Sequence, residues 1–168
     1  ELGEWRPLAA PGSEESAASE LVREASGPFV RLTGSLGGLH RVLAVEPATC
    51  YEFRGEVRAH ADTVWPRAFR GASFWLGEAA SAAPIGELLA APATSFERVR
   101  LLPTAAGTSG WQLRSTVFVT GPRTHFLHLV CSLSERQALT NGAVDFRAIE
   151  LRSRTLAAFG LAQLRSAQ

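Results

Sequence analysis

The segment 50–60 carries an ionisable side chain at every second position. Side chains of an extended strand alternate between its two faces, so these residues share one face. Carboxylates and guanidiniums in such a row can form hydrogen bonds with hydroxyl groups and with carboxylate or sulfate anions. The alternative is a solvated face held by cross-strand ion pairs, each contributing roughly a few tenths of a kcal/mol. The row consists of Glu52, Arg54, Glu56, Arg58 and His60.

Catalysis by this row is not expected. Glu52 and Glu56 would lie about 13 Å apart along one strand, which exceeds the carboxylate separation of glycoside hydrolases. The chain also has no nucleophile elbow, no phosphate-binding loop, no dinucleotide fingerprint and no HExxH zinc motif. We therefore expect a protein that is not an enzyme.

The elements that must position the row are short strands bounded by Gly, Pro, Asn and Thr. Nine of them at roughly 10–20-residue spacing predict an all-β, two-sheet antiparallel sandwich of the jelly-roll type. The stretch 78–93 interrupts the pattern as a long loop with one helical turn at 85–90. The expected strands are 21–24, 28–34, 39–46, 50–60, 69–77, 95–102, 111–120, 124–133 and 143–152.

The tail of the chain changes period. Leu156, Phe159 and Leu164 fit a weak helical stripe. We expect one domain over residues 1–153 and a short C-terminal helical tail or linker over 154–168, leading toward a neighbouring domain.

Composition excludes some classes of protein. Of the 168 residues, 46% are hydrophobic, so the chain can bury a core. All 17 basic residues are Arg, they face 16 acidic residues, and they form no basic block, which argues against nucleic acid as a partner. No apolar run is long enough to span a membrane. Abundant Ala, Gly and Arg are typical of a bacterial protein, and Cys50 and Cys131 fall on faces of opposite polarity, which argues against a disulfide.

Three segments in a fixed order resemble the galactose-binding-like jelly roll of several carbohydrate-binding module families. They are GPFVRLTGSLGGLHRVLAVEPATCYEFRGEVRA at 27–59, TSGWQLRSTVFVTGP at 108–122 and NGAVDFRAIELR at 141–152. The resemblance implies a two-sheet sandwich, often fused to a glycoside hydrolase, lyase, esterase or sulfatase. Trp111 matches the Trp that packs in the core of that family.

The resemblance also implies which residues would bind a glycan. In such a fold the strands 50–60, 111–120 and 124–133 can lie in one sheet, and several Arg side chains on one face would favour an acidic polysaccharide. Trp65 and Trp75 are candidates for stacking on sugar rings. The predicted ligand-binding residues are Arg54, Arg58, Trp65, Trp75, Gln112, Arg114 and His128.

A structural calcium ion is a further alternative. The family's last strand commonly provides an acidic ligand, but here Arg147 and Ala148 occupy the matching positions. Calcium prefers six to eight oxygen ligands, several of them carboxylates. Glu4, Asp145 and Glu150 could provide them together with backbone carbonyls.

The sequence thus favours a non-catalytic carbohydrate-binding module of a larger bacterial carbohydrate-active enzyme, secreted or periplasmic, with a polysaccharide or oligosaccharide as ligand and a catalytic domain as neighbour. The alternative is a structural or protein-interaction sandwich, a spacer that binds no glycan.

Overall fold

The computed structural model describes residues 4–8, 18–34, 37–60, 63, 72–103, 110–134 and 143–155. This part of the chain forms ten strands and two short helices. In chain order the elements are β1 (Arg6–Leu8), β2 (Ala18–Glu24), β3 (Gly27–Thr33), β4 (Gly37–Ala44), β5 (Cys50–Ala59), β6 (Ser73–Ala79), α1 (Ile85–Ala90), α2 (Pro92–Ser95), β7 (Phe96–Pro103), β8 (Gln112–Val119), β9 (Phe126–Ser134) and β10 (Ala143–Arg154).

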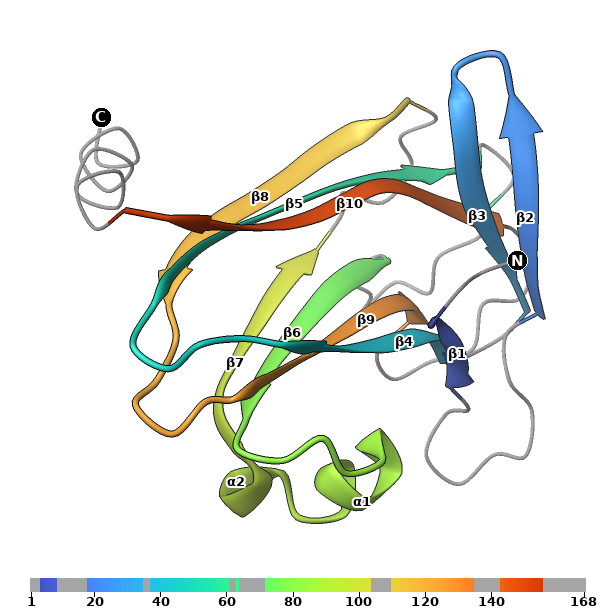
Figure 1. The fold of residues 1–168 in the computed structure, drawn as a ribbon. Coiled ribbons are helices and arrows are strands. Elements are labelled where there is room, and N and C mark those ends of the chain that lie inside the picture. Colours follow the sequence, from blue (N-terminus) through green and yellow to red (C-terminus); the bar gives the residue numbers. More distant parts are fainter. Residues whose placement is uncertain are drawn as a thin grey trace.

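The strands form two five-stranded sheets. The first has the order β1-β4-β9-β6-β7 and the second the order β2-β3-β10-β5-β8, and every pairing is antiparallel. Figure 1 shows them as two layers, with β8, β5 and β10 above β7, β6, β9 and β4. The predicted jelly-roll sandwich is confirmed, and each of the nine expected strands is present; the three-residue strand β1 was not predicted.

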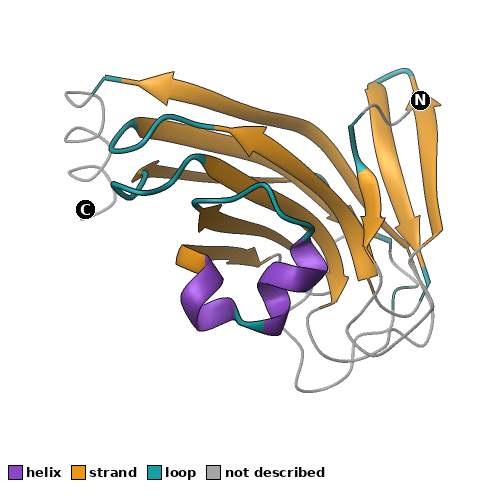
Figure 2. Ribbon diagram, turned by 60° about the horizontal axis from the view of Figure 1, so that its bottom comes forward, coloured by secondary structure: helices purple, strands orange, loops and turns teal. Residues whose placement is uncertain are grey.

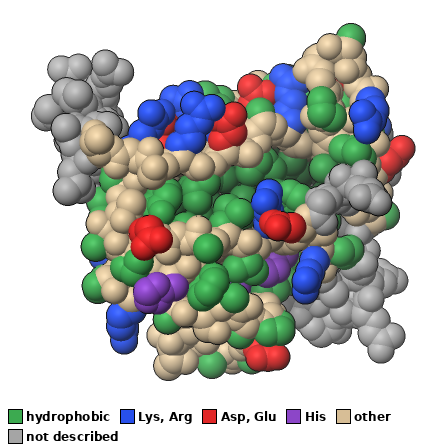
Figure 3. Space-filling model, in the orientation of Figure 1, with side chains coloured by type: hydrophobic (Ala, Val, Ile, Leu, Met, Phe, Trp, Pro, Cys, Tyr) green, Lys and Arg blue, Asp and Glu red, His purple; other side chains and the backbone are tan. Residues whose placement is uncertain are grey.

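The core lies between the two sheets and follows the alternation read in 50–60. Tyr51, Phe53 and Val57 point inward and are almost fully buried. The Phe53 and Phe146 rings each pack edge-on against Phe74 of the opposite sheet, at ring-centroid distances of 5.2 and 5.3 Å. Figure 3 shows the side of this core as a hollowed band of hydrophobic side chains between the layers. The two sheets are therefore held together by aromatic packing.

A β-bulge in β10 decides which side chains reach the outer face of the second sheet. Arg147 pairs with Glu56 and Glu150 pairs with Arg54, so two residues of β10 stand opposite the single Gly55. Ala148, within the bulge, has a positive φ of 49°. The extra residue reverses the alternation, because without it Ile149 would face solvent and Glu150 would face the core.

The outer face of the first sheet is covered by α1 and α2, which lie on one side of the strands in Figure 2. Leu88 of α1 and Phe96 pack with Ala79 in a small second cluster, against which Trp75 lies. The helical turn predicted at 85–90 is confirmed with the same bounds. Neither helix among the described residues has the length and apolar character needed to cross a membrane.

Both cysteines are buried free thiols. Cys131 lies in the interlayer core, whereas Cys50 pairs with Arg154 on the outer side of the second sheet. The expected absence of a Cys50–Cys131 bridge is confirmed by the opposite faces that the two residues occupy. Of the tail predicted over 154–168, Arg154 is the last residue of β10, and Leu156, Phe159 and Leu164 lie outside the described residues.

Candidate functional site

The outer face of the second sheet is concave. Trp111 precedes β8 at one edge of the sheet and Phe29 lies on β3, with β5 and β10 between these strands. Strands in a flat sheet are about 4.8 Å apart, so three spacings place β3 and β8 about 14 Å from each other. The two rings nevertheless meet at a centroid distance of 5.6 Å. Figure 1 shows the upper ends of β2 and β3 rising above β10 and β5 on this side of the sheet, and we call this curled surface the concave face.

One half of the concave face is organised around a buried carboxylate. Asp145 is fully buried and accepts hydrogen bonds from Arg31 Nε at 2.9 Å, from Arg58 Nη2 at 2.6 Å and from His60 Nε2 at 2.8 Å. Although burial opposes the charged form, hydrogen bonds from Arg31, Arg58 and His60 hold the pKa of Asp145 below its ordinary value. The ionised Asp145 carboxylate therefore holds the side chains of Arg31, Arg58 and His60 in place through charged hydrogen bonds.

Aromatic rings complete the same half. Arg147 and Arg58 lie over the Trp111 ring, at 4.0 and 4.5 Å from guanidinium carbon to ring centroid, and Arg58 also lies over Phe29 at 5.1 Å. Arg147 Nε donates to Glu56 at 2.5 Å. We call this the covered half, because cation–π contacts and ion pairs occupy its polar groups. The expectation that Trp111 packs in the interlayer core is wrong, since the ring lies on the concave face.

The other half, which begins beyond the bulge, is open to solvent. Its three arginine side chains are 39–57% exposed. Glu52 pairs with Arg54 and Arg154, and Glu150 pairs with Arg152. The hydrogen bond from Arg154 is the largest influence lowering the pKa of Glu52. We call this the open half; three guanidiniums against two carboxylates leave it one positive charge, and its charged residues are Glu52, Arg54, Glu150, Arg152 and Arg154.

Figure 3 shows basic and acidic side chains side by side along the upper rim of the molecule, where Figure 1 has β10 and β5. The adjoining edge strand β8 presents Leu113, 56% exposed, opposite Glu56. The exposed guanidiniums and carboxylates of the open half can form hydrogen bonds with hydroxyl groups and with anions, and no buried group has to move first.

The structure separates the predicted ligand-binding residues. Arg54 and Arg58 lie on the concave face, in the open and the covered half. The register pairs Gln112 with Val57 and Arg114 with Gly55, so both face the interlayer side of the sheet. His128 belongs to β9 in the other sheet. The prediction that these residues form one patch is wrong, because alternation on a single strand does not show which face is outside.

The two candidate tryptophans are not on the concave face either. Trp75 lies on the outer face of the first sheet, where its ring meets Phe96 edge-on at 5.0 Å. Trp65 lies outside the described residues. Sequence reasoning missed Arg147, Arg152 and Arg154 as site residues. The bulge that brings Arg152 and Arg154 to this face has a sequence signal: the core-facing apolar positions change from even numbers (Val144, Phe146) to odd numbers (Ile149, Leu151).

The three proposed calcium ligands lie apart. Glu4 Oε2 accepts from Arg41 Nη2 at 2.8 Å, Asp145 is held by its arginines, and Glu150 pairs with Arg152 at 2.6 Å. Within the described ranges, no three His, Cys, Asp or Glu side chains converge as metal ligands would. The arginine partners occupy the oxygens that a cation would need.

No family model matches the sequence, and no curated protein matches it. Among solved structures, the enzymatically active domain of tailspike protein 4 of bacteriophage CBA120 has a TM-score of 0.66 at 6% identity, over 92% of this chain and 20% of that chain. The chain thus spans about a fifth of the length of that solved chain. A CBM4 structure has a TM-score of 0.57 at 12% identity, over 89% of this chain and 86% of that one.

TmCBM61, solved with β-1,4-galactotriose, has a TM-score of 0.52 at 14% identity, over 92% of this chain and 91% of that one. Modules of families 22 and 16 also share the arrangement. At these identities the similarity concerns the fold. The chain has the jelly-roll fold of carbohydrate-binding modules.

Proposed function

We propose that the chain is a non-catalytic carbohydrate-binding module that binds an acidic polysaccharide on the open half of its concave face. The observation that carries the proposal is the exposure of Arg54, Arg152 and Arg154 on one curled surface, with one positive charge in excess. A curled sheet follows the contour of an extended chain molecule. The wider setting belongs to the same proposal: a secreted or periplasmic bacterial enzyme in which the residues after Arg154 lead to a catalytic domain.

The chemistry of the open half favours an acidic ligand over a neutral one. A guanidinium binds a carboxylate or sulfate through two parallel hydrogen bonds, which are stronger than neutral ones. Glu52 and Glu150 can accept hydrogen bonds from sugar hydroxyls. The affinity will be modest, because an open surface buries little of the ligand.

The test is affinity electrophoresis of the purified chain in gels containing polygalacturonate, alginate, xylan or hydroxyethylcellulose, at low and moderate salt. We expect retardation by the acidic polymers that weakens with salt, as exposed charges are screened. Arg54→Ala combined with Arg152→Ala should weaken binding about tenfold or more. Arg123→Ala, an exposed arginine in the turn between β8 and β9, is the matched control and should bind as wild type.

Retardation by xylan or hydroxyethylcellulose that is unaffected by the double variant would overturn the acidic preference. Absence of binding to every polymer would overturn the carbohydrate-binding function and favour a structural spacer.

A further inference from the structure

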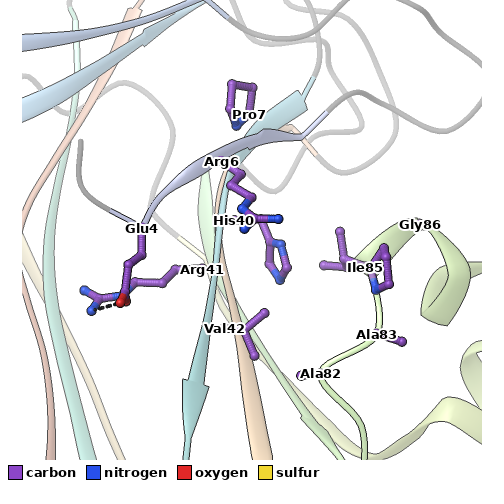
Figure 4. A pocket seen from close by; sticks show the side chains of 11 residues that line it. Glu4, Arg6, Pro7, His40, Arg41, Val42, Ala82, Ala83, Ile85 and Gly86 are labelled. Carbon is purple, nitrogen blue, oxygen red and sulfur yellow. Dashed lines mark hydrogen bonds and ion pairs between the residues drawn. The ribbon is translucent and has the colours of Figure 1, made fainter. Parts of the chain in front are cut away.

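A pocket of about 510 Å³ opens on the opposite side of the molecule from the concave face. Its walls come from β1, β4 and the loop that leads into α1. Figure 4 shows His40 and Arg6 on one side of it and Ile85, Ala83 and Ala82 on the other. Its volume lies within the range of small-molecule sites, roughly 300–1,000 Å³.

A chain of hydrogen bonds fixes the tautomer of the histidine in this wall. His128 Nε2 lies 3.0 Å from the carbonyl oxygen of Ser81, which can only accept, so His128 carries its proton on Nε2. His128 Nδ1 is then an acceptor, and His40 Nε2, at 3.1 Å, must donate to it. It follows that the remaining ring nitrogen, His40 Nδ1, has a lone pair and acts as an acceptor.

This assignment requires both rings to be neutral, and their surroundings keep them so. Burial, assisted by His128 and Arg6, lowers the pKa of His40 to about 4, and burial also lowers the pKa of His128. The two rings lie nearly coplanar, at an interplanar angle of 7° and a centroid distance of 5.3 Å, and the Phe96 ring meets His128 edge-on. At neutral pH, His40 therefore offers a fixed uncharged acceptor.

The charge of the pocket comes from Arg6. Arg41 donates from Nε and Nη2 to Glu4 Oε2, at 3.2 and 2.8 Å, and in Figure 4 this pair lies on the other side of β4 from His40, so it adds no net charge to the pocket. Among the residues that the structure describes, Arg6 has no ion-pair partner. The pocket thus combines a cationic donor, a neutral acceptor and apolar side chains, of which Val42 and Ile85 are at least half-buried.

We infer that this pocket binds a single sugar acid, with Arg6 on the carboxylate, His40 Nδ1 accepting from a ring hydroxyl, and Val42 and Ile85 against the C–H face of the ring. The choice of a sugar among hydroxy acids rests on the proposed function; the site itself is separate from the concave face. A chain end or a free monosaccharide fits it, since the pocket has the volume for a small ligand.

The experiment is titration of the isotope-labelled chain with sodium galacturonate, galactose and sodium acetate, followed by amide and imidazole ¹⁵N spectra. We expect saturable shifts in 38–42 and 81–86 with galacturonate, weaker ones with galactose or acetate, and an imidazole spectrum with a bare Nδ1 on His40. Arg6→Gln should raise the Kd for galacturonate about tenfold. Ala82→Phe, at an exposed lining position, should abolish binding by filling the pocket.

Arg123→Gln is the matched control and should bind galacturonate as wild type. Equal binding of acetate and galacturonate, no effect of Arg6→Gln, or a proton on His40 Nδ1 would each overturn the inference. Arg152→Ala separates the two sites, because it should weaken binding of polygalacturonate and leave galacturonate unchanged. If the polymers fail to bind while galacturonate binds in the pocket, the proposed function fails and the pocket assignment stands.

Discussion

The outer faces of the two sheets are covered in different ways. On the first sheet, α1 and α2 pack Leu88 and Phe96 over Ala79, with Trp75 beside them. On the second sheet, side chains of the strands themselves form the cover, with Asp145 beneath arginines. An apolar cover is stabilised by removal of surface from water, whereas an ionic cover is stable only while every buried charge keeps its partner. The two faces should therefore respond differently to substitution and to pH.

The largest effect is expected from Asp145→Asn in the ionic cover. The substitution leaves Arg31 and Arg58 without their buried partner, and breaking such a cluster costs about 3 kcal/mol. The free energy of unfolding measured by urea denaturation should fall by that amount. A loss below about 1 kcal/mol would show that solvent replaces the carboxylate and that the two faces do not differ as argued.

The pH response should come mainly from the helix-covered face, through His40. Its pKa falls from 6.5 to about 4 on folding, so between these values the unfolded chain binds a proton that the folded chain does not. Stability is therefore fully present above pH 6.5 and declines as the pH falls toward 4. The decline attributable to His40 is roughly 3 kcal/mol, at about 1.4 kcal/mol per pKa unit. Urea denaturation at pH 7, 5.5 and 4.5 measures it, and His40→Gln should have a shallower decline; parallel curves would contradict the assignment.

A steric test of the apolar cover is Gly77→Ala. A Cβ at this position would lie 2.3 Å from the Trp75 ring and 2.7 Å from the Phe96 ring. Moving two packed rings costs roughly 1–3 kcal/mol, which thermal unfolding would detect. Gly86→Ala is the control, because nothing lies within 4 Å of the added carbon. Equal melting temperatures for the two variants would mean that the apolar cover is loosely packed.

The smallest effect is expected from Glu150→Gln in the open half. Glu150 and Arg152 are 47% and 57% exposed, and such pairs contribute at most about 0.5 kcal/mol. The same urea measurement should show almost no change, while the lost negative charge should strengthen binding of acidic polymers. A loss comparable to that of Asp145→Asn would remove the distinction between the covered and open halves.

The fold could be predicted from the sequence because each strand carries its own alternation and turn residues. In β5, Tyr51, Phe53 and Val57 identify the buried face without reference to any other strand. The helical turn at 85–90 was also local. The strand β1 could not be predicted, since three residues hold too little pattern and it exists through pairing with β4.

The candidate site was less predictable because it depends on pairing between strands. Gln112 and Arg114 are polar residues at alternate positions, which predicted that they share the wet face with Arg54. However, β8 is an edge strand with polar residues on both of its faces, so this alternation does not identify the outer face. His128 is polar within an apolar strand, and its partner His40 is 88 residues away. Arg152 and Arg154 reach the concave face because of the bulge at Ala148. Alanine rarely adopts the left-handed backbone conformation found there, so the residue type does not predict the bulge.

The two buried thiols are independent probes of local opening in the sandwich. Burial raises the pKa of both Cys50 and Cys131, so neither reacts with an alkylating reagent until its surroundings open. Cys131 reports on separation of the two layers, and Cys50, beside Arg154, reports on loosening of the far end of the concave face. Labelling rates of the two sites, compared within one sample, would reveal whether the sandwich opens as a unit or whether its second sheet loosens first.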